Sequence, residues 1–134
     1  MSTRANIILK EEQSWKDENG KKHNHVEKLY FYRHSDGYPE SVLPSLKPFM
    51  DWLKSGMIRD NVSQAGGWII LLGANEYNTE LPKDDGRGMG WKVGAYEPTT
   101  GLHGDINYLY TIDLSKKTLD HKKVPFGYVE THDE

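Results

Sequence analysis

The sequence predicts a two-layer α+β sandwich, in which an antiparallel sheet of four to five strands carries two helices on one face. Two observations lead to this class. Segments near both ends of the chain are rich in β-branched and aromatic residues and alternate in polarity, which is typical of strands. Between them, apolar residues recur every three or four positions, which is typical of helices. The predicted order of elements is therefore β-β-α-α-β-β-β.

A single domain, 1–134, is expected from the length of 134 residues. The chain has no cysteine, which excludes thiol nucleophiles, cysteine-based zinc sites and disulfides. Its longest apolar run, residues 68–72, is far shorter than the roughly 20 residues that span a bilayer. The N-terminus also lacks the apolar core of a signal peptide. We therefore expect a cytoplasmic protein that does not act at a membrane.

The charge balance bears on the class of partner. The formal net charge is -3, from 17 Lys plus Arg against 20 Asp plus Glu. Such a chain has no long-range positive field to attract phosphate backbones, so no general nucleic-acid binding is expected. The paired lysines at 21–22, 116–117 and 122–123 lie beside predicted turns, and we interpret them as solvated sheet edges.

Two strands are predicted near the N-terminus, the first from Arg4 to Glu11 and the second from Val26 to His34. The polar segment between them, 12–25, is predicted to be a long mobile hairpin that turns at Asn19-Gly20, because both residues tolerate positive φ. In the second strand the side chains alternate. One face receives Leu29, Phe31 and Arg33, and the other receives Tyr30, Tyr32 and His34.

The first helix follows the turn at Asp36-Gly37. Pro39 suits a first helical turn because it has no backbone N–H to leave unpaired, and Gly56 suits the helix end. The apolar residues of segment 42–53 fall at helical spacing. Either the helix begins near Pro44, or it begins at Pro39 and is bent by its interior prolines.

A second helical pattern begins after Asn61, which is predicted to cap it. Val62, Ala65, Ile69 and Leu72 repeat at helical spacing. The apolar run 68–72 would also suit a buried strand, but the cap and the spacing favour a helix. Gly66, Gly67 and Gly73 are then expected to let this helix pack closely on the sheet.

The remainder of the chain predicts a surface loop, three strands and a tail. Glycines and charged residues without an apolar period occupy the loop at 78–90. The strands are predicted at 91–96, 106–114 and 118–124, with a turn at 98–101 and an acidic tail at 125–134. The sheet face opposite the helices is expected to carry many of the tyrosines. That face is either a binding surface or a result of ordinary β-propensity.

Three blocks of sequence carry a resemblance. They are MSTRANI at 1–7, YRHSDGYPE at 32–40 and GDINYLY at 104–110. Together they resemble a group of small uncharacterised bacteriophage and prophage proteins that begin Met-x-Thr-Arg-x-x-Ile and carry Tyr-Arg-x-x-Asp-Gly-Tyr-Pro. The chain departs from that pattern in segment 12–25, at Pro44 and Pro48, and in the run 68–72. The resemblance implies a viral or prophage setting and an accessory role such as blocking a host defence, but no catalytic residues.

Chemically versatile residues gather where the second strand turns into the first helix. An extended strand places His34 and Asp36 on one face, and the start of the helix supplies partial positive charge. We therefore predict a pocket for an anionic small molecule or nucleotide, formed by Arg4, Arg33, His34, Asp36, Gly37 and Tyr38. The alternative is structural. Asp36 would cap the turn, Gly37 would supply an unusual backbone angle, and an arginine would pair with Asp36.

Enzymatic signatures are weaker. Neither Ser41 nor Ser63 lies in a Gly-x-Ser-x-Gly elbow, and segment 86–90 lacks the Gly-Lys-Ser/Thr end of a phosphate loop. His23-Asn24-His25 and the pair His103 and Asp105 have metal-ligand spacing, but no zinc signature completes them. We predict a non-catalytic binding protein without metal or cofactor, a host-defence antagonist that binds a small anionic ligand or a host protein. The alternative is a metal- or His/Asp-dependent hydrolase acting on a phosphoester or nucleotide.

Overall fold

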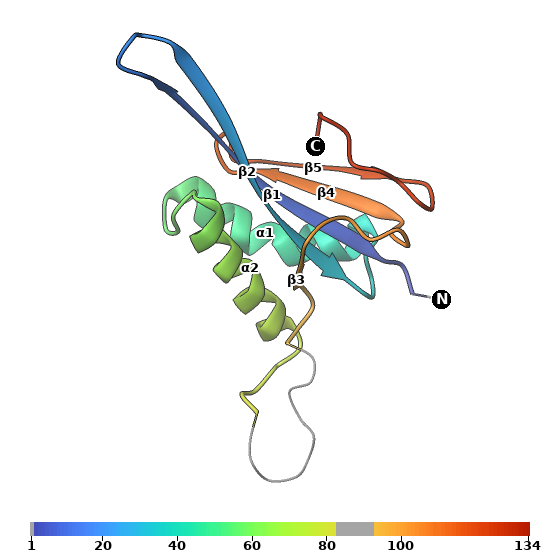
Figure 1. The fold of residues 1–134 in the computed structure, drawn as a ribbon. Helices are drawn as coiled ribbons and strands as arrows, with labels where there is room; N and C mark the ends of the chain where they lie inside the picture. The colour runs from blue at the N-terminus through green and yellow to red at the C-terminus, as the bar shows by residue number, and fades with distance from the viewer. Residues whose placement is uncertain (1, 83–92) are drawn as a thin grey trace.

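The fold is the predicted α+β class, with both helices on one face of a five-stranded sheet (Figure 1). The computed structural model describes residues 2–82 and 93–134. Within these ranges the strands are β1 (Ala5–Lys16), β2 (Lys22–Arg33), β3 (Glu97–Thr99), β4 (Tyr108–Asp113) and β5 (Thr118–Lys123), and the helices are α1 (Pro39–Ser55) and α2 (Val62–Glu76). Neither described helix combines the length and apolar character needed to cross a bilayer.

The sheet is mixed, whereas the sequence predicted an antiparallel one. Its strand order is β3-β2-β1-β4-β5, and β4 lies parallel to β1. The parallel pair arises because residues 100–107 cross the outer face of the sheet, the face opposite the helices, before β4 begins. During this crossing the His103 N–H donates to Asn6 Oδ1 at 2.8 Å. Parallel strands need such a crossover, and sequence pattern does not reveal it.

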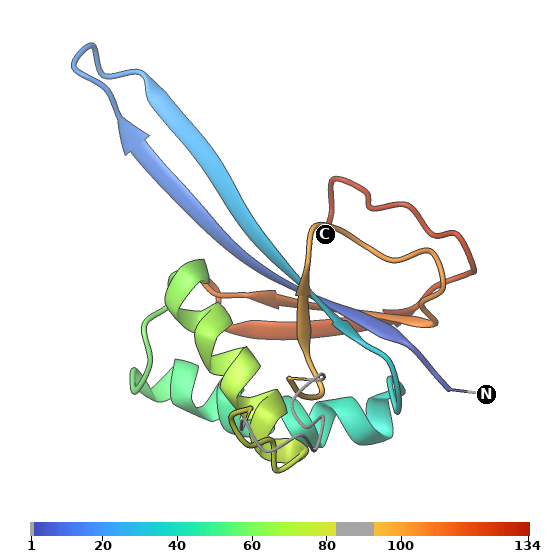
Figure 2. The same cartoon turned by 60° about the horizontal axis from the view of Figure 1, so that its bottom comes forward.

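β1 and β2 form a two-stranded ribbon that projects beyond the other strands (Figure 2). The predicted mobile hairpin 12–25 is therefore wrong in its extent, because pairing continues to Lys16 opposite Lys22 and only residues 17–21 turn. Asp17 organises this turn by accepting the N–H groups of Asn19 and Lys21, both at 2.9 Å. Polar residues in this ribbon gave no burial signal that would predict a strand. We call residues 10–29 the ribbon.

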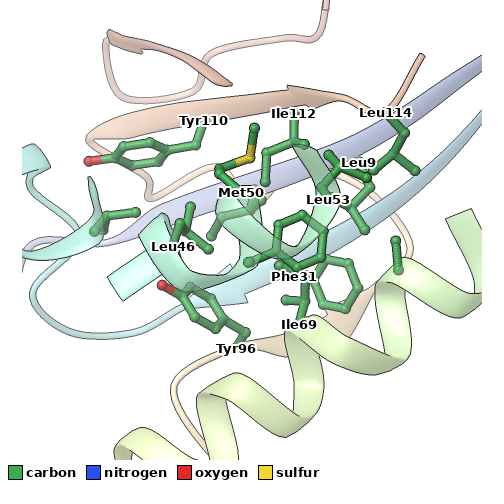
Figure 3. Close-up of a cluster of buried hydrophobic side chains, with 14 of the residues drawn as sticks. Leu9, Phe31, Leu46, Met50, Leu53, Ile69, Tyr96, Tyr110, Ile112 and Leu114 are labelled. Atoms are coloured by element: carbon green, nitrogen blue, oxygen red, sulfur yellow. The ribbon is translucent and has the colours of Figure 1, made fainter. Parts of the chain in front are cut away.

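The main core lies between the sheet and the two helices (Figure 3). The predicted alternation in β2 is confirmed, since Phe31 and Arg33 face the helices and Tyr32 faces outward. The run 68–72 is helical, as the capping and spacing favoured. The largest core side chains from the strands, helices and the approach to β3 include Leu9, Phe31, Leu46, Leu53, Ile69, Tyr96, Tyr110 and Ile112.

A smaller apolar cluster lies on the outer face, under the C-terminal segment. It comprises Ile8, Tyr32, Ile106, Leu109 and Val124, with Tyr30, Leu102 and Tyr128 packed against it. The acidic tail predicted at 125–134 therefore folds back over the sheet. The tyrosines are divided between the faces, because Tyr108 and Tyr110 pack toward the helices. This division leaves the outer face without the continuous tyrosine surface that alternation alone suggested.

The helix ends differ from the predictions in one respect. α1 begins at Pro39, the earlier of the two starts considered, and Gly56 ends it with φ 78°, as expected. α2 begins at Val62, but Asn61 makes no side-chain capping bond. Instead Glu11 of β1 accepts the Val62 N–H at 3.1 Å, which places a carboxylate at the positive end of the helix.

The region around β3 also differs. Residues 91 and 92 of the predicted strand 91–96 lie outside the described residues, as does most of the predicted loop 78–90. Residues 93–96 are not a strand, and β3 (Glu97–Thr99) overlaps the predicted turn at 98–101. β3 forms because its residues pair with Tyr30–Tyr32 of β2, a long-range contact that the local turn signal of Pro98 concealed.

Close packing of α2 depends on two of its three glycines. A Cβ added at Gly73 would lie 2.8 Å from the backbone nitrogen of Tyr96, and one at Gly66 would lie 2.8 Å from Leu29 Cδ1. A Cβ at Gly67 would meet nothing within 4 Å. The expectation of close packing on the sheet is therefore confirmed at Gly66 and wrong at Gly67, while Gly73 packs closely on residues 95–96, just before β3.

Alanine substitutions in α2 distinguish a closely packed glycine, Gly73, from one without close neighbours, Gly67. Gly73→Ala should lower the free energy of unfolding by about 1–3 kcal/mol, because the Tyr96 backbone must move. Gly67→Ala is the control and should raise it by about 0.5–1 kcal/mol through helix propensity. Urea denaturation followed by circular dichroism measures both. Equal effects at the two positions would contradict the packing.

Candidate functional site

Arg33 ends β2 on the helix side of the sheet, where only 3% of the residue is exposed. Its guanidinium contacts both carboxylate oxygens of Glu76, with Nη2 2.9 Å from Oε2 and Nη1 3.2 Å from Oε1. Its Nε donates to the carbonyls of Ser35 and Asp36 at 2.9 and 3.2 Å. Burial alone lowers the pKa of Arg33, but the hydrogen bond and charge of Glu76 outweigh it and raise the pKa. Arg33 is therefore charged and fully engaged inside the protein.

Glu76 connects this arginine to both helices. Ser45 of α1 donates to Glu76 Oε1 at 2.6 Å, and the same hydroxyl lies 2.6 Å from the Tyr96 hydroxyl. The Arg33 guanidinium carbon lies 5.2 Å from the Tyr96 ring centroid, a cation–π contact. We call Arg33, Ser45, Glu76 and Tyr96 the inner network. The inner network connects β2, α1, α2 and the residue that precedes β3.

A second polar group, the outer cluster, lies on the opposite face. It comprises Arg4, Tyr32, His34, Glu97, His103 and Asp105. The Tyr32 hydroxyl donates to Asp105, with 2.9 Å to each carboxylate oxygen, and Arg4 Nε lies 3.4 Å from Asp105 Oδ2. Burial, followed by the Asp105 hydrogen bond, raises the pKa of Tyr32 to about 12.

Two histidine rings contact Tyr32 in the outer cluster. His103 stacks on it with centroids 3.8 Å apart, and His34 meets it edge-on at 4.5 Å. His34 Nε2 lies 3.0 Å from Glu97 Oε1. The His34 and Glu97 side chains are 43% and 41% exposed, so this pair lies at the surface. The contact with Glu97 orients the His34 imidazole and connects the end of β2 to the start of β3.

The turn between these groups is held by close backbone and side-chain contacts. Asp36 has φ 55°, so the unusual backbone angle belongs to Asp36 and not to Gly37. Gly37 is needed for close approach, because a Cβ there would lie 2.9 Å from Ala5 Cβ. Its carbonyl accepts the Tyr110 hydroxyl at 2.8 Å. Tyr38 precedes α1, and its hydroxyl lies 3.3 Å from Asp36 Oδ1.

The sheet separates three of the six residues predicted to form one pocket, and the other three form the turn. Arg33 points into the helix layer, while Arg4 and His34 belong to the outer cluster. His34 pairs with Glu97 and not with Asp36, and the arginines pair with Glu76 and Asp105. Arg33 does approach Asp36, but its Nε contacts the Asp36 carbonyl, and the charged partners of Arg4, Arg33 and His34 are other carboxylates.

The partners that sequence reasoning missed lie far from this turn in the chain. They are Ser45, Glu76, Tyr96, Glu97 and Asp105. One signal was present for Glu76. Alternation placed Arg33 on the buried face, a buried charge needs a counter-charge, and Glu76 is the single charged residue in α2.

The ribbon is largely exposed and carries an unusual arrangement of charges. Its two faces carry pairs of like charge directly opposite each other across the strands, which is destabilising. Lys10 opposes Lys28 and Lys16 opposes Lys22 on the outer face, whereas Glu11 opposes Glu27 on the helix face. Among the described residues, every hydrogen bond, ion pair and ring contact of residues 13–25 is made within the ribbon.

Comparisons with known proteins give no match, since no family model, curated protein or solved structure matches the chain. The resemblance to bacteriophage and prophage proteins thus stays a prediction. No group of three or more histidine, aspartate or glutamate side chains in the ranges 2–82 and 93–134 is arranged to hold a metal ion.

Removing Glu76 tests the inner network. Glu76→Ala should lower the free energy of unfolding by about 3 kcal/mol, because it leaves the buried Arg33 charge unpaired. The control is Asp51→Ala, which breaks the exposed Lys47–Asp51 pair and should cost about 0.5 kcal/mol or less. Urea unfolding measures both, and similar losses would argue against a special role for the network.

Tyr32 should make stability depend on alkaline pH. Because its folded pKa of about 12 exceeds the ordinary value of 10.0, its contribution is complete below pH 10 and is lost as the pH rises toward 12. Tyr32→Phe should therefore reduce the slope of unfolding free energy against pH in this window. Tyr38→Phe, which removes an exposed hydroxyl, is the control. An unchanged slope in Tyr32→Phe would contradict the assignment.

Proposed function

We propose that this chain is a non-catalytic binding protein that recognises a partner macromolecule through the β1–β2 ribbon. The observation that carries this proposal is the exposure of the ribbon together with its opposed like charges. Trp15 is 50% exposed and Val26 is 45% exposed, although both belong to regular strands. Exposed aromatic side chains of this kind are common anchors of protein interfaces.

The energetics of the ribbon support the same proposal. Isolated two-stranded ribbons are marginal in water, and the Lys10–Lys28 and Lys16–Lys22 pairs add repulsion. The ribbon contacts the rest of the domain mainly at its base. There Glu11 caps α2, and the Glu12 backbone bonds to the Ser115 hydroxyl. A partner that covers the helix side of the ribbon would bury Trp15, and one that also reaches the outer side would offset the repulsion within the lysine pairs.

The geometry gives less support to a small anionic ligand at the Arg33–Pro39 turn. The Arg33 guanidinium is occupied by Glu76, and the first turn of α1 carries the acidic Glu40. An anion there would meet the helix dipole without the arginine that the sequence suggested. We therefore favour the macromolecular partner. If the bacteriophage resemblance holds, that partner is a host component, and the chain would act by blocking a host function.

Substitution of Trp15 tests the proposal. The tagged chain is used to capture partners from lysate of the cells that produce it, and quantitative mass spectrometry compares variants. Trp15→Ala should reduce the recovery of a stoichiometric partner at least about tenfold, because aromatic anchors dominate interface energy.

The control is Met57→Ala, which removes a side chain from a residue that is 74% exposed, between the two helices and outside the ribbon. It should leave recovery unchanged. Circular dichroism should show that both variants keep the fold. Equal recovery of a partner with the Trp15→Ala bait, or no stoichiometric partner at all, would refute ribbon-mediated binding.

A further inference from the structure

We infer that the partner supplies an extended, carboxylate-rich peptide segment, and that this segment binds along the outer face of the ribbon. This inference rests on the proposed function and adds the chemical class of the partner. The surface concerned, which we call the lysine face, consists of Lys10, Lys16, Lys22 and Lys28. These residues lie on the same side of the ribbon because strand residues alternate and the two pairs are in register.

Among the described residues, one carboxylate from outside the ribbon binds this surface, which also carries Glu12 of β1. Glu130, from the C-terminal segment, accepts a hydrogen bond from Lys28 Nζ at 2.9 Å. The same carboxylate accepts the Tyr30 hydroxyl, with 2.9 and 2.8 Å to its two oxygens. Lys28 and Tyr30 are two residues apart on β2 and face outward together. The base of the lysine face therefore binds a carboxylate brought from about 100 residues away.

The rest of the lysine face is unoccupied by any intramolecular partner. Within the described part of the chain, the side chains of Lys10, Lys16 and Lys22 form no hydrogen bond or ion pair. An open groove of about 710 Å³ runs between the ribbon and the C-terminal segment, lined by Lys10, Lys28 and Glu130 among others. Carboxylates placed along this face would relieve the repulsion within both lysine pairs.

The backbone favours a peptide over a nucleic acid. β3 pairs with Tyr30–Tyr32 of β2, and no other described segment pairs with this edge, so from residue 22 to 29 it carries N–H and C=O groups without a partner among the described residues. An extended peptide that pairs with this edge as an added strand would place every second side chain on the outer side, beside Lys22 and Lys28, and a nucleic acid cannot pair in this way.

Glu130 acts in this arrangement as an internal competitor. The segment 125–134 crosses the outer face, and Glu130 holds the two groups, Lys28 and Tyr30, that an incoming carboxylate would use first. A partner carboxylate at this position must displace Glu130, so removing its charge should strengthen partner binding.

Fluorescence anisotropy of labelled probes tests the inference. The probes are a peptide of alternating Glu and Thr, a matched peptide of alternating Gln and Thr, and a single-stranded oligonucleotide. Saturable 1:1 binding of the Glu peptide, with weak binding of the other two, supports the inference. Equal binding of the Gln peptide, preferential binding of the oligonucleotide, or no binding of the Glu peptide would overturn it.

Paired lysine variants localise the binding. Lys10→Gln with Lys22→Gln removes one member of each like-charged pair, so it should weaken Glu-peptide binding about fivefold while leaving the thermal midpoint unchanged or raised. The control, Lys47→Gln with Lys54→Gln on α1, removes the same charge and should leave the affinity unchanged. Equal weakening by both variants would show a nonspecific charge effect and overturn the lysine face.

Glu130→Gln should bind the Glu peptide more tightly than the wild type does, by about threefold or more, because Lys28 is no longer paired with a carboxylate. Unchanged or weaker binding would overturn the competition. These results are independent of the test of the proposed function. If a partner is recovered in a Trp15-dependent way but the Glu peptide does not bind, the ribbon remains the binding element and only the acidic class of partner is wrong.

Discussion

The buried pairing of Arg33 with Glu76 is the interaction on which the arrangement of the helices depends. A guanidinium enclosed between a sheet and two helices is tolerated only when a carboxylate and further acceptors surround it. Glu76 meets this need from the last turn of α2, and Ser45 extends the bonding to α1. The apolar core defines how closely the layers approach, but these directed bonds fix the orientation of both helices on the sheet.

This pairing also determines which chemistry remains at the surface. With Arg33 enclosed, the strand-to-helix turn loses its strongest cation, and the histidines of the outer cluster are paired with or stacked on their neighbours. In the described part of the chain, residues 13–25 of the ribbon make side-chain contacts only with one another and with other ribbon residues. Its charges are arranged in a way that domain stability does not explain, and this contrast is the basis for assigning recognition to the ribbon.

Local sequence patterns predicted the helices and strands. They did not predict which distant residues and strands pair with one another. Alternation placed Phe31 and Arg33 on the helix face, and helical spacing identified α2 despite its strand-like run 68–72. The same patterns could not show that Glu11 caps α2, that His34 pairs with Glu97, or that β4 lies parallel to β1. Each depends on chain crossings that bring distant residues together, and residue spacing along one strand contains no information about them. Arg33 and His34 do not share one side of the sheet, because adjacent residues of a strand point to opposite faces.

The position of β1 has a consequence for how the chain reaches its folded state. β1 lies at the centre of the sheet, and its partner on one side, β4, follows about 100 residues later, with Ala5 opposite Tyr108. During synthesis the β1–β2 hairpin is complete long before β4 emerges. Until then, the edge of β1 that will pair with β4 has no strand beside it, and the apolar residues of β1 are exposed. Contacts of such sequence separation slow folding and expose the intermediate to aggregation. The charged residues of the distal hairpin would help to keep that early intermediate dispersed.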